Sequence, residues 1–244
     1  MSVSVLRTVS LSAAVLAACL TAPAAFAAET TPPTSDYTYT ITKDDTVTIT
    51  GYTGSDTVLT VPQKLGGSPV TEIAADAFAE QTALTSVTLP DGLRKIADDA
   101  FFDCTSLETL TLPDSVTSLT GAAFSGCTQE IKLTLDGNSP YTVDNGALCA
   151  DNGRTLVAYL GGADTFAVPD TVTKIAASAI VNPDTKVVSL PASVTRLGTQ
   201  AVGYSRAAGS DAATLTPEFY LTTDKTFSSE VQRYATKNGI ACFT

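Results

Sequence analysis

The chain has 244 residues, of which 44% are hydrophobic and only 16% are charged, so it can bury one or two sizeable cores. It carries 25 acidic and 14 basic residues, and this net charge of −11 argues against nucleic acid or an anionic membrane as a partner, because both bind clustered Lys and Arg. Histidine and tryptophan are absent, which removes the commonest general base and metal ligand and weakens the case for a carbohydrate-stacking cleft.

Residues 1–27 have the pattern of an export signal. Arg7 supplies a positively charged start, and Val9 to Leu20 form an apolar run that is too short to span a bilayer. Ala25-Phe26-Ala27 is a small-x-small cleavage site. We therefore predict cleavage after Ala27 and a protein that is secreted or held at the cell surface, without a transmembrane span.

A second interpretation of this segment stays open. Leu16-Ala17-Ala18-Cys19 resembles a bacterial lipobox, in which Cys19 would be lipidated and become the first residue of the mature protein. The apolar run that continues to Phe26 favours cleavage after Ala27 instead. Residues 28–36, AETTPPTSD, have the composition of an extended Thr/Pro-rich spacer.

Residues 37–60 predict a β-hairpin that caps the N-terminal end of the fold. Tyr37 to Ile41 and Thr46 to Thr50 both alternate in polarity, and Lys43-Asp44-Asp45 between them is a turn-like cluster. A cap is needed there because the first coil of a repeat array would otherwise expose its core and a strand edge.

Residues 61–203 contain five copies of the pattern Pro-x-x-[Val/Leu]-x-x-[Ile/Leu]-x-x-x-Ala-[Phe/Ile/Val]. Four copies, which begin at Pro90, Pro113, Pro169 and Pro191, keep the same offsets, and the first copy, from Pro62, has five extra residues. A period near 23 predicts a solenoid, since one such unit cannot bury its apolar face without a stacked neighbour.

Within each copy the sequence predicts a short inward-facing strand and a buried centre. Residues 84–89, 107–112 and 131–135 should pair as parallel strands, with Leu89, Leu112 and Leu135 in one internal ladder. The residues after the alanines, Phe78, Phe101 and Phe124, should stack as a spine.

Two segments depart from the period. In the insert at residues 136–165, Asp144-Asn145-Gly146 and Asp151-Asn152-Gly153 are turn signals, which predict a hairpin carried on the solenoid. Residues 204–244 predict a C-terminal cap with a strand at Phe219 to Leu221 and a final strand at Ile240 to Phe243. Between them, Ser228 or Ser229 should cap a helix over Glu230 to Lys237 that stops at Asn238-Gly239.

The units LTSVTLPDGLRKIADDAFFDCTSLETLTLPDSVTSLTGAAFSGC resemble the BspA-like, Treponema-type class of bacterial surface leucine-rich repeats, and the resemblance covers roughly residues 45–244. It implies a leucine-rich-repeat solenoid with a short parallel β-sheet and an irregular or short-helical convex side. It also implies an exported or surface protein, and some members are credited with adhesion to host or extracellular-matrix proteins. The family has no catalytic motif to carry over. This chain departs from it at Ile180 and Val202, where Phe is usual.

The candidate binding surface is the outward face of the predicted strands. Its side chains form a flat strip of hydroxyls with one lysine: Ser86, Thr88, Thr109, Thr111, Lys132 and Thr134, followed by Val187 and Ser189. Concave solenoid faces are frequent binding surfaces. The competing interpretation is that Ser and Thr are there because they suit exposed strand positions.

Cysteines and acidic turns are the other candidate sites. Cys104 and Cys127 occupy the same repeat position on successive coils, so they can either form a disulfide in an exported protein or stack as small buried thiols. The Asp/Asn/Gly clusters of the insert lack the ligand spacing of a calcium loop, and we expect turns there, with no metal and no cofactor.

Three hypotheses of function follow. The first, which we favour, is a monomeric module that binds a protein ligand, such as a host or extracellular-matrix protein, through the strip or, failing that, through the insert around Tyr141 and Tyr159. The second is a structural spacer in an envelope assembly. The third is a hydrolase that uses acids of residues 136–165. We expect no enzyme, because the chain lacks histidine and shows no buried polar constellation.

Overall fold

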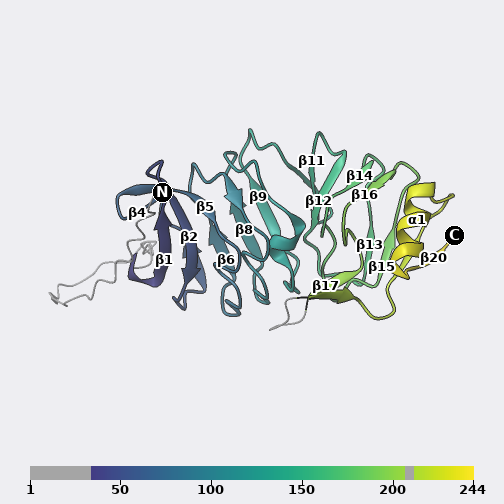
Figure 1. Ribbon diagram of the computed structural model, residues 1–244, viewed down its shortest axis with the longest axis horizontal. Coiled ribbons are helices and arrows are strands. Elements are labelled where there is room, and N and C mark those ends of the chain that lie inside the picture. Colours follow the sequence, from purple (N-terminus) through teal and green to yellow (C-terminus); the bar gives the residue numbers. More distant parts are fainter. Residues whose placement is uncertain (1–33, 207–211) are drawn as a thin grey trace, which may run out of the picture.

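The computed structural model describes residues 34–206 and 212–244, and the chain winds through them as an elongated solenoid from an N-terminal hairpin to a C-terminal helix (Figure 1). The predicted signal peptide with its cleavage site at Ala27, the alternative lipidation site Cys19 and residues 28–33 of the spacer lie outside the described residues. Within the described ranges, none of the helices has the length and apolar character needed to cross a membrane.

The N-terminal hairpin forms as predicted and closes the first coil. Strands β1 (Tyr37–Ile41) and β2 (Val47–Tyr52) pair antiparallel, and β2 continues in parallel with β5 (Ser68–Ile73) of the first repeat. The ring of Tyr52 lies 5.0 Å from that of Tyr37 and 5.5 Å from that of Phe78, so the hairpin covers the end of the core. The five extra residues of the first copy form a small hairpin between β4 (Lys64–Leu65) and β5, where Gly66 and Gly67 adopt positive φ.

The first repeats build one parallel sheet, which we call the N-terminal sheet. Its strands lie in the order β3 (Val58–Thr60), β6 (Ser86–Thr88), β8 (Thr109–Leu112) and β9 (Lys132–Leu135). The predicted pairing is confirmed, because Leu112 lies opposite Leu135 and the N–H of Leu89 donates to the carbonyl of Thr111. On the adjacent wall, β7 (Lys95–Ile96) pairs with β5.

The predicted aromatic spine is also present. Phe78 and Phe101 stack with ring centroids 5.2 Å apart, and Phe101 and Phe124 follow at 5.8 Å, with both pairs of rings nearly parallel. The small alanine before each phenylalanine is buried and lets the backbone of the next coil approach closely. Phe124 itself lies at the end of a short 3-10 helix, η2 (Gly121–Phe124).

The insert at residues 136–165 holds three strands where the sequence predicted one hairpin. Strands β10 (Thr142–Asp144), β11 (Ala147–Ala150) and β12 (Thr155–Tyr159) form an antiparallel meander. All five residues of β12 are buried, and β12 pairs in parallel with β14 (Lys174–Ile175), which pairs with β16 (Arg196–Leu197). The last strand of the meander is therefore part of the solenoid wall.

We call the side of the solenoid that carries the N-terminal sheet its front, and the insert divides this side into two parts. Strands β13 (Thr165–Ala167), β15 (Val187–Ser189), β19 (Tyr220–Thr222) and β20 (Ala241–Phe243) form a second parallel sheet, the C-terminal sheet, which does not pair with β9. The buried hydrophobic residues likewise fall into two clusters, one under each sheet. The molecule thus has two stacked halves with the meander between them (Figure 1).

The C-terminal cap contains the predicted helix, α1 (Ser229–Asn238). The hydroxyl of Ser228 accepts a hydrogen bond from the N–H of Val231, and Gly239 ends the helix in the left-handed conformation. A second hairpin, β17 (Tyr204–Arg206) and β18 (Ala213–Leu215), projects from this half along the lower side of the solenoid (Figure 1). One further short 3-10 turn, η1 (Thr34–Asp36), precedes β1.

Candidate functional site

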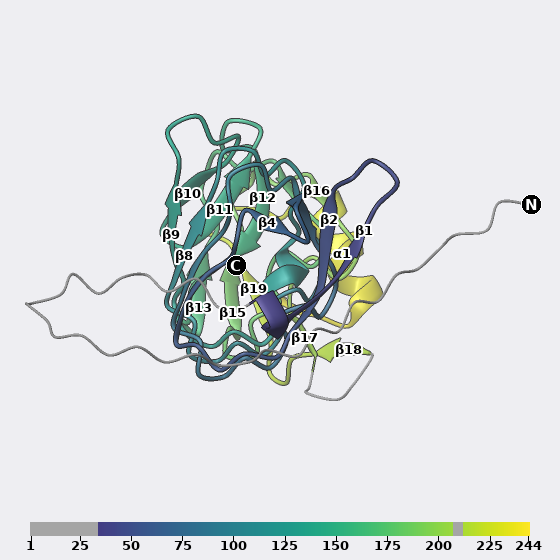
Figure 2. The same cartoon turned by 90° about the vertical axis from the view of Figure 1, so that its left-hand side faces the viewer.

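The outward face of the N-terminal sheet carries the predicted strip in two rows. One row places Ser86, Thr109 and Lys132 opposite one another, and the second row consists of Thr88, Thr111 and Thr134. Thr88, Thr109, Lys132 and Thr134 are exposed, while Ser86 and Thr111 are half-buried. The Thr109 hydroxyl donates to that of Ser86 at 2.8 Å. Figure 2 shows β8 and β9 at one margin of the solenoid, with α1 on the other side of the molecule.

The strip does not run the length of the solenoid. Val187 and Ser189, which the sequence predicted to lie in the same strip, belong to the C-terminal sheet. That sheet presents an aromatic pair that sequence reasoning missed: Tyr220 and Phe243 meet edge to face, with ring centroids 5.3 Å apart. The alternation in Phe219-Tyr220-Leu221, with Phe219 and Leu221 buried, was the signal that Tyr220 faces outward.

Cys104 and Cys127 are both buried, and their thiols are free in this structure. Each thiol instead contacts the preceding coil: Cys104 Sγ donates to the carbonyl of Phe78 at 3.1 Å, and Cys127 Sγ donates to that of Phe101 at 3.3 Å. Burial raises the pKa of the Cys104 thiol to about 12 and raises the pKa of the Cys127 thiol further still. Neither cysteine is therefore a nucleophile near neutral pH.

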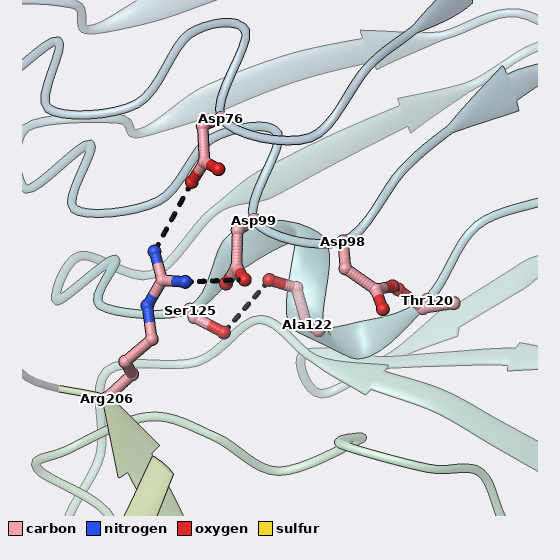
Figure 3. Close-up of polar contacts among 7 residues, drawn as sticks. All are labelled: Asp76, Asp98, Asp99, Thr120, Ala122, Ser125 and Arg206. Carbon is pink, nitrogen blue, oxygen red and sulfur yellow. Dashed lines mark hydrogen bonds and ion pairs between the residues drawn. The ribbon is translucent and has the colours of Figure 1, made fainter. Parts of the chain in front are cut away.

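A second polar cluster lies on the turn side of the coils, around Arg206 of β17 (Figure 3). Its guanidinium donates to Asp99 Oδ2 at 2.9 Å and to Asp76 Oδ1 at 3.3 Å. It also lies over the ring of Phe102, 3.9 Å from the centroid. Asp76 and Asp99 occupy the same repeat position on successive coils, both with left-handed φ, so one arginine bridges two coils.

This cluster is largely shielded from water at its centre. The side chains of Arg206 and Asp99 are 19% and 21% exposed, whereas that of Asp76 is 60% exposed. Burial raises the pKa of Asp99 above its ordinary value, and the positive charge of Arg206 offsets only part of that effect. A cavity of about 200 Å³ opens beside the cluster and is lined by Asp98, Asp99 and Arg206 together with Ser125, Ser178 and Gln200.

The polar groups of this cluster are largely engaged with one another. Asp98 accepts a hydrogen bond from Thr120, and the hydroxyl of Ser125 donates to the carbonyl of Ala122 at 2.9 Å. The cluster is built around the ion pair between Arg206 and Asp99, and a hydrogen bond from Ser125 also favours the charged form of the Asp99 carboxyl. Over residues 34–206 and 212–244, no three or more Asp, Glu, Cys or His side chains gather in a way that could hold a metal ion.

Residues 66–156 match, in six copies, the family model described as the BspA type leucine rich repeat region. This part of the chain therefore consists of BspA-type leucine-rich repeats. The search of curated proteins found no match.

Solved structures similar to this chain include a leucine rich repeat protein of T. pallidum, at 19% identity and a TM-score of 0.45, with 87% of this chain and 98% of that chain covered. A leucine rich cell surface protein from Faecalibacterium prausnitzii has 19% identity and a TM-score of 0.30 over 84% and 77% of the two chains. A leucine-rich repeat protein from Bacteroides ovatus has 20% identity and a TM-score of 0.43, with 68% of this chain and 49% of that chain covered. These similarities are remote, and the assignment to BspA-type repeats rests on the match of residues 66–156.

The residues of the strip lie within the BspA-type repeats at residues 66–156, whereas Arg206 lies outside them. Sequence reasoning found the strip because period-2 alternation within each repeat separates outward from inward residues. It missed Arg206 because that residue lies outside the repeats, 130 and 107 residues from Asp76 and Asp99. The aspartates directly before Ala77 and Ala100 were the only local signal, and they do not identify Arg206 as their partner.

Proposed function

We propose that this chain is an exported module that binds a protein ligand through the outward face of the N-terminal sheet and acts in adhesion at the cell surface or in the extracellular space. The observation that carries the proposal is the exposed double row of hydroxyls with Lys132 on a flat parallel sheet. Export rests on the signal pattern of residues 1–27. A host or extracellular-matrix protein is the partner class that the repeat family suggests.

The geometry of the strip suits a macromolecular partner. Adjacent strands repeat a hydroxyl about every 4.8 Å, which provides hydrogen-bond donors and acceptors at regular spacing across the sheet. A flat surface of this kind allows broad contact over many residues, whereas small ligands are usually enclosed in a concave, mostly apolar pocket. Lys132 is the one cation in the strip and would fix the orientation of an acidic group on the partner.

The alternative surfaces have less support. Tyr141 and Tyr159 of the insert are both buried, so they do not offer the aromatic surface that the sequence suggested. The four aspartates between residues 136 and 164 are exposed on the surface and do not line the cavity beside Arg206, which gives the hydrolase hypothesis no constellation to act with: Asp136, Asp144, Asp151 and Asp164.

The proposal is tested by binding residues 28–244 to a panel of host matrix proteins and cell-wall glycans. For any ligand found, Lys132→Glu combined with Thr109→Arg should abolish binding, because both side chains point outward, and should leave the thermal midpoint nearly unchanged. The matched control is Lys186→Glu combined with Thr165→Arg, which makes the same charge change at exposed positions at and beside the C-terminal sheet and should leave binding intact.

Two results would count against the proposal. If the Lys132 and Thr109 variant keeps its affinity while the control variant loses it, the binding surface lies on the C-terminal sheet near Tyr220 and Phe243. If no member of the panel binds, the result favours the spacer hypothesis over the binding hypothesis. In either case circular dichroism of each variant shows whether the fold is intact.

A further inference from the structure

Each front sheet ends in a strand with an unpaired edge, at opposite ends of the solenoid. Among the strands of the described residues, β3 pairs only with β6, and β20 pairs only with β19. The N-terminal hairpin leaves β3 open because β2 pairs with β5 on the adjacent wall. An unpaired edge exposes backbone N–H and C=O groups that can accept another strand.

Apolar side chains are exposed on these same two strands. In the part of the chain that the structure describes, four large hydrophobic residues are exposed: Ile41, Val58, Val143 and Phe243. The two most exposed lie on the end strands, Val58 of β3 at 67% and Phe243 of β20 at 57%. All three residues of β20 are exposed, whereas the pairing strand β19 is buried or half-buried.

The charges at the two ends are opposite in sign. Residues 34–65 hold four aspartates and two lysines, which sum to −4 + 2 = −2. Residues 224–244 hold two acidic residues and three basic ones, which sum to −2 + 3 = +1. Counting side chains alone, the C-terminal end is slightly basic and the N-terminal end is acidic, in a chain with a net charge of −11.

We infer that the chain associates head to tail with a second copy of itself, with β20 of one copy placed in parallel beside β3 of the next. Every strand of both front sheets runs parallel to its neighbours, so this addition continues the ladder without reversing direction. The contact brings the apolar side chains of Val58 and Phe243 out of water and pairs the two open edges. It joins two different surfaces that lie at opposite ends of an elongated solenoid, so successive copies extend into open chains of molecules.

This inference does not rest on the proposed ligand-binding function, since it uses the ends of the sheets and not the Thr109 and Lys132 strip. The sequence alone favoured a monomer because both ends looked capped. In the part of the chain that the structure describes, the hairpin and α1 cap the core, while no strand pairs with the outer edges of β3 and β20. Self-association would produce an extended assembly, which is what the spacer hypothesis requires.

The test is sedimentation equilibrium of residues 28–244 under reducing conditions, over a wide range of protein concentration. The weight-average mass should rise with concentration above that of one chain. Val58→Lys and Phe243→Asp each place a repelling charge at one end, and each variant alone should sediment as a monomer. Val143→Lys alters an exposed apolar residue of the insert and is the matched control, which should associate like the parent chain.

Mixing the two blocked variants separates this arrangement from others. The Val58→Lys chain keeps an intact β20 and the Phe243→Asp chain keeps an intact β3, so an equal mixture should form a dimer and nothing larger. If Val58→Lys alone still dimerises, the contact joins two copies of β20, and the head-to-tail inference is wrong. A parent chain that stays monomeric at every concentration also overturns it, and ligand binding by such a monomer would leave the proposed function standing.

Discussion

Replacing Arg206 by alanine should destabilise the protein by about 2–4 kcal/mol. The charge-assisted hydrogen bond to Asp99, between two side chains that are each about one-fifth exposed, contributes roughly 1.5–3 kcal/mol. The stacking of the guanidinium over Phe102 adds roughly 0.5–1 kcal/mol. The pair with Asp76, whose side chain is 60% exposed, adds little because water screens it.

The pair matters beyond its energy because it joins the two halves of the molecule. Arg206 lies on the β17–β18 hairpin of the C-terminal half, while Asp76, Asp99 and Phe102 belong to coils of the N-terminal half. The two hydrophobic clusters meet mainly at the meander. Loss of Arg206 should therefore broaden the urea transition, as the halves begin to unfold separately.

Urea unfolding of four proteins gives the measurement: the parent, Arg206→Ala, Asp99→Asn and the double variant. The double-mutant cycle should give a coupling energy of about 1–3 kcal/mol between Arg206 and Asp99. Asp76→Asn is the matched control and should cost less than about 0.5 kcal/mol, because its side chain is mostly exposed. A loss below about 0.5 kcal/mol for Arg206→Ala, or a coupling energy near zero, would refute the reasoning.

Two further predictions concern the core. Phe101→Ala removes the middle ring of the aromatic stack and should cost about 3–5 kcal/mol in urea unfolding, whereas a loss under about 1 kcal/mol would mean that the stack contributes little. In a thiol-labelling assay on residues 28–244 at pH 8, exposed Cys242 should react fast, while buried Cys104, with its pKa raised to about 12, should react only when the protein unfolds. Rapid labelling of Cys104 in the native state would contradict the buried-thiol ladder.

The periodic parts of the fold could be predicted from the sequence because they depend on local spacing. A residue at a fixed offset from the alanine of each copy meets its equivalent in the next coil, so Phe78, Phe101 and Phe124 had to stack once the coils did. The helix of the C-terminal cap could also be predicted from the sequence, because Ser228 and Gly239 are start and stop signals that act within a few residues.

The remaining features depend on contacts that no period encodes. The buried strand β12 reads Thr-Leu-Val-Ala-Tyr, an apolar run without alternation, and only its parallel partner β14 shows that it belongs to the solenoid wall. The break between β9 and β13 follows from the path of the meander, and it divides a strip that looked continuous in sequence. Arg206 reaches its partners across more than 100 residues.

The division of the front face bears directly on how this protein could bind. A strip on three short strands offers few hydrogen bonds, and polar contacts exposed to water contribute modest affinity each, so one N-terminal sheet alone is a weak binding surface. Head-to-tail association would repeat that strip once per molecule along an open chain of copies. Several weak contacts on one ligand-coated surface then act together, because each contact raises the effective concentration of the next. Adhesion through a shallow hydroxyl surface is therefore physically reasonable for an assembled chain of these molecules, even where a single copy binds too weakly to be retained.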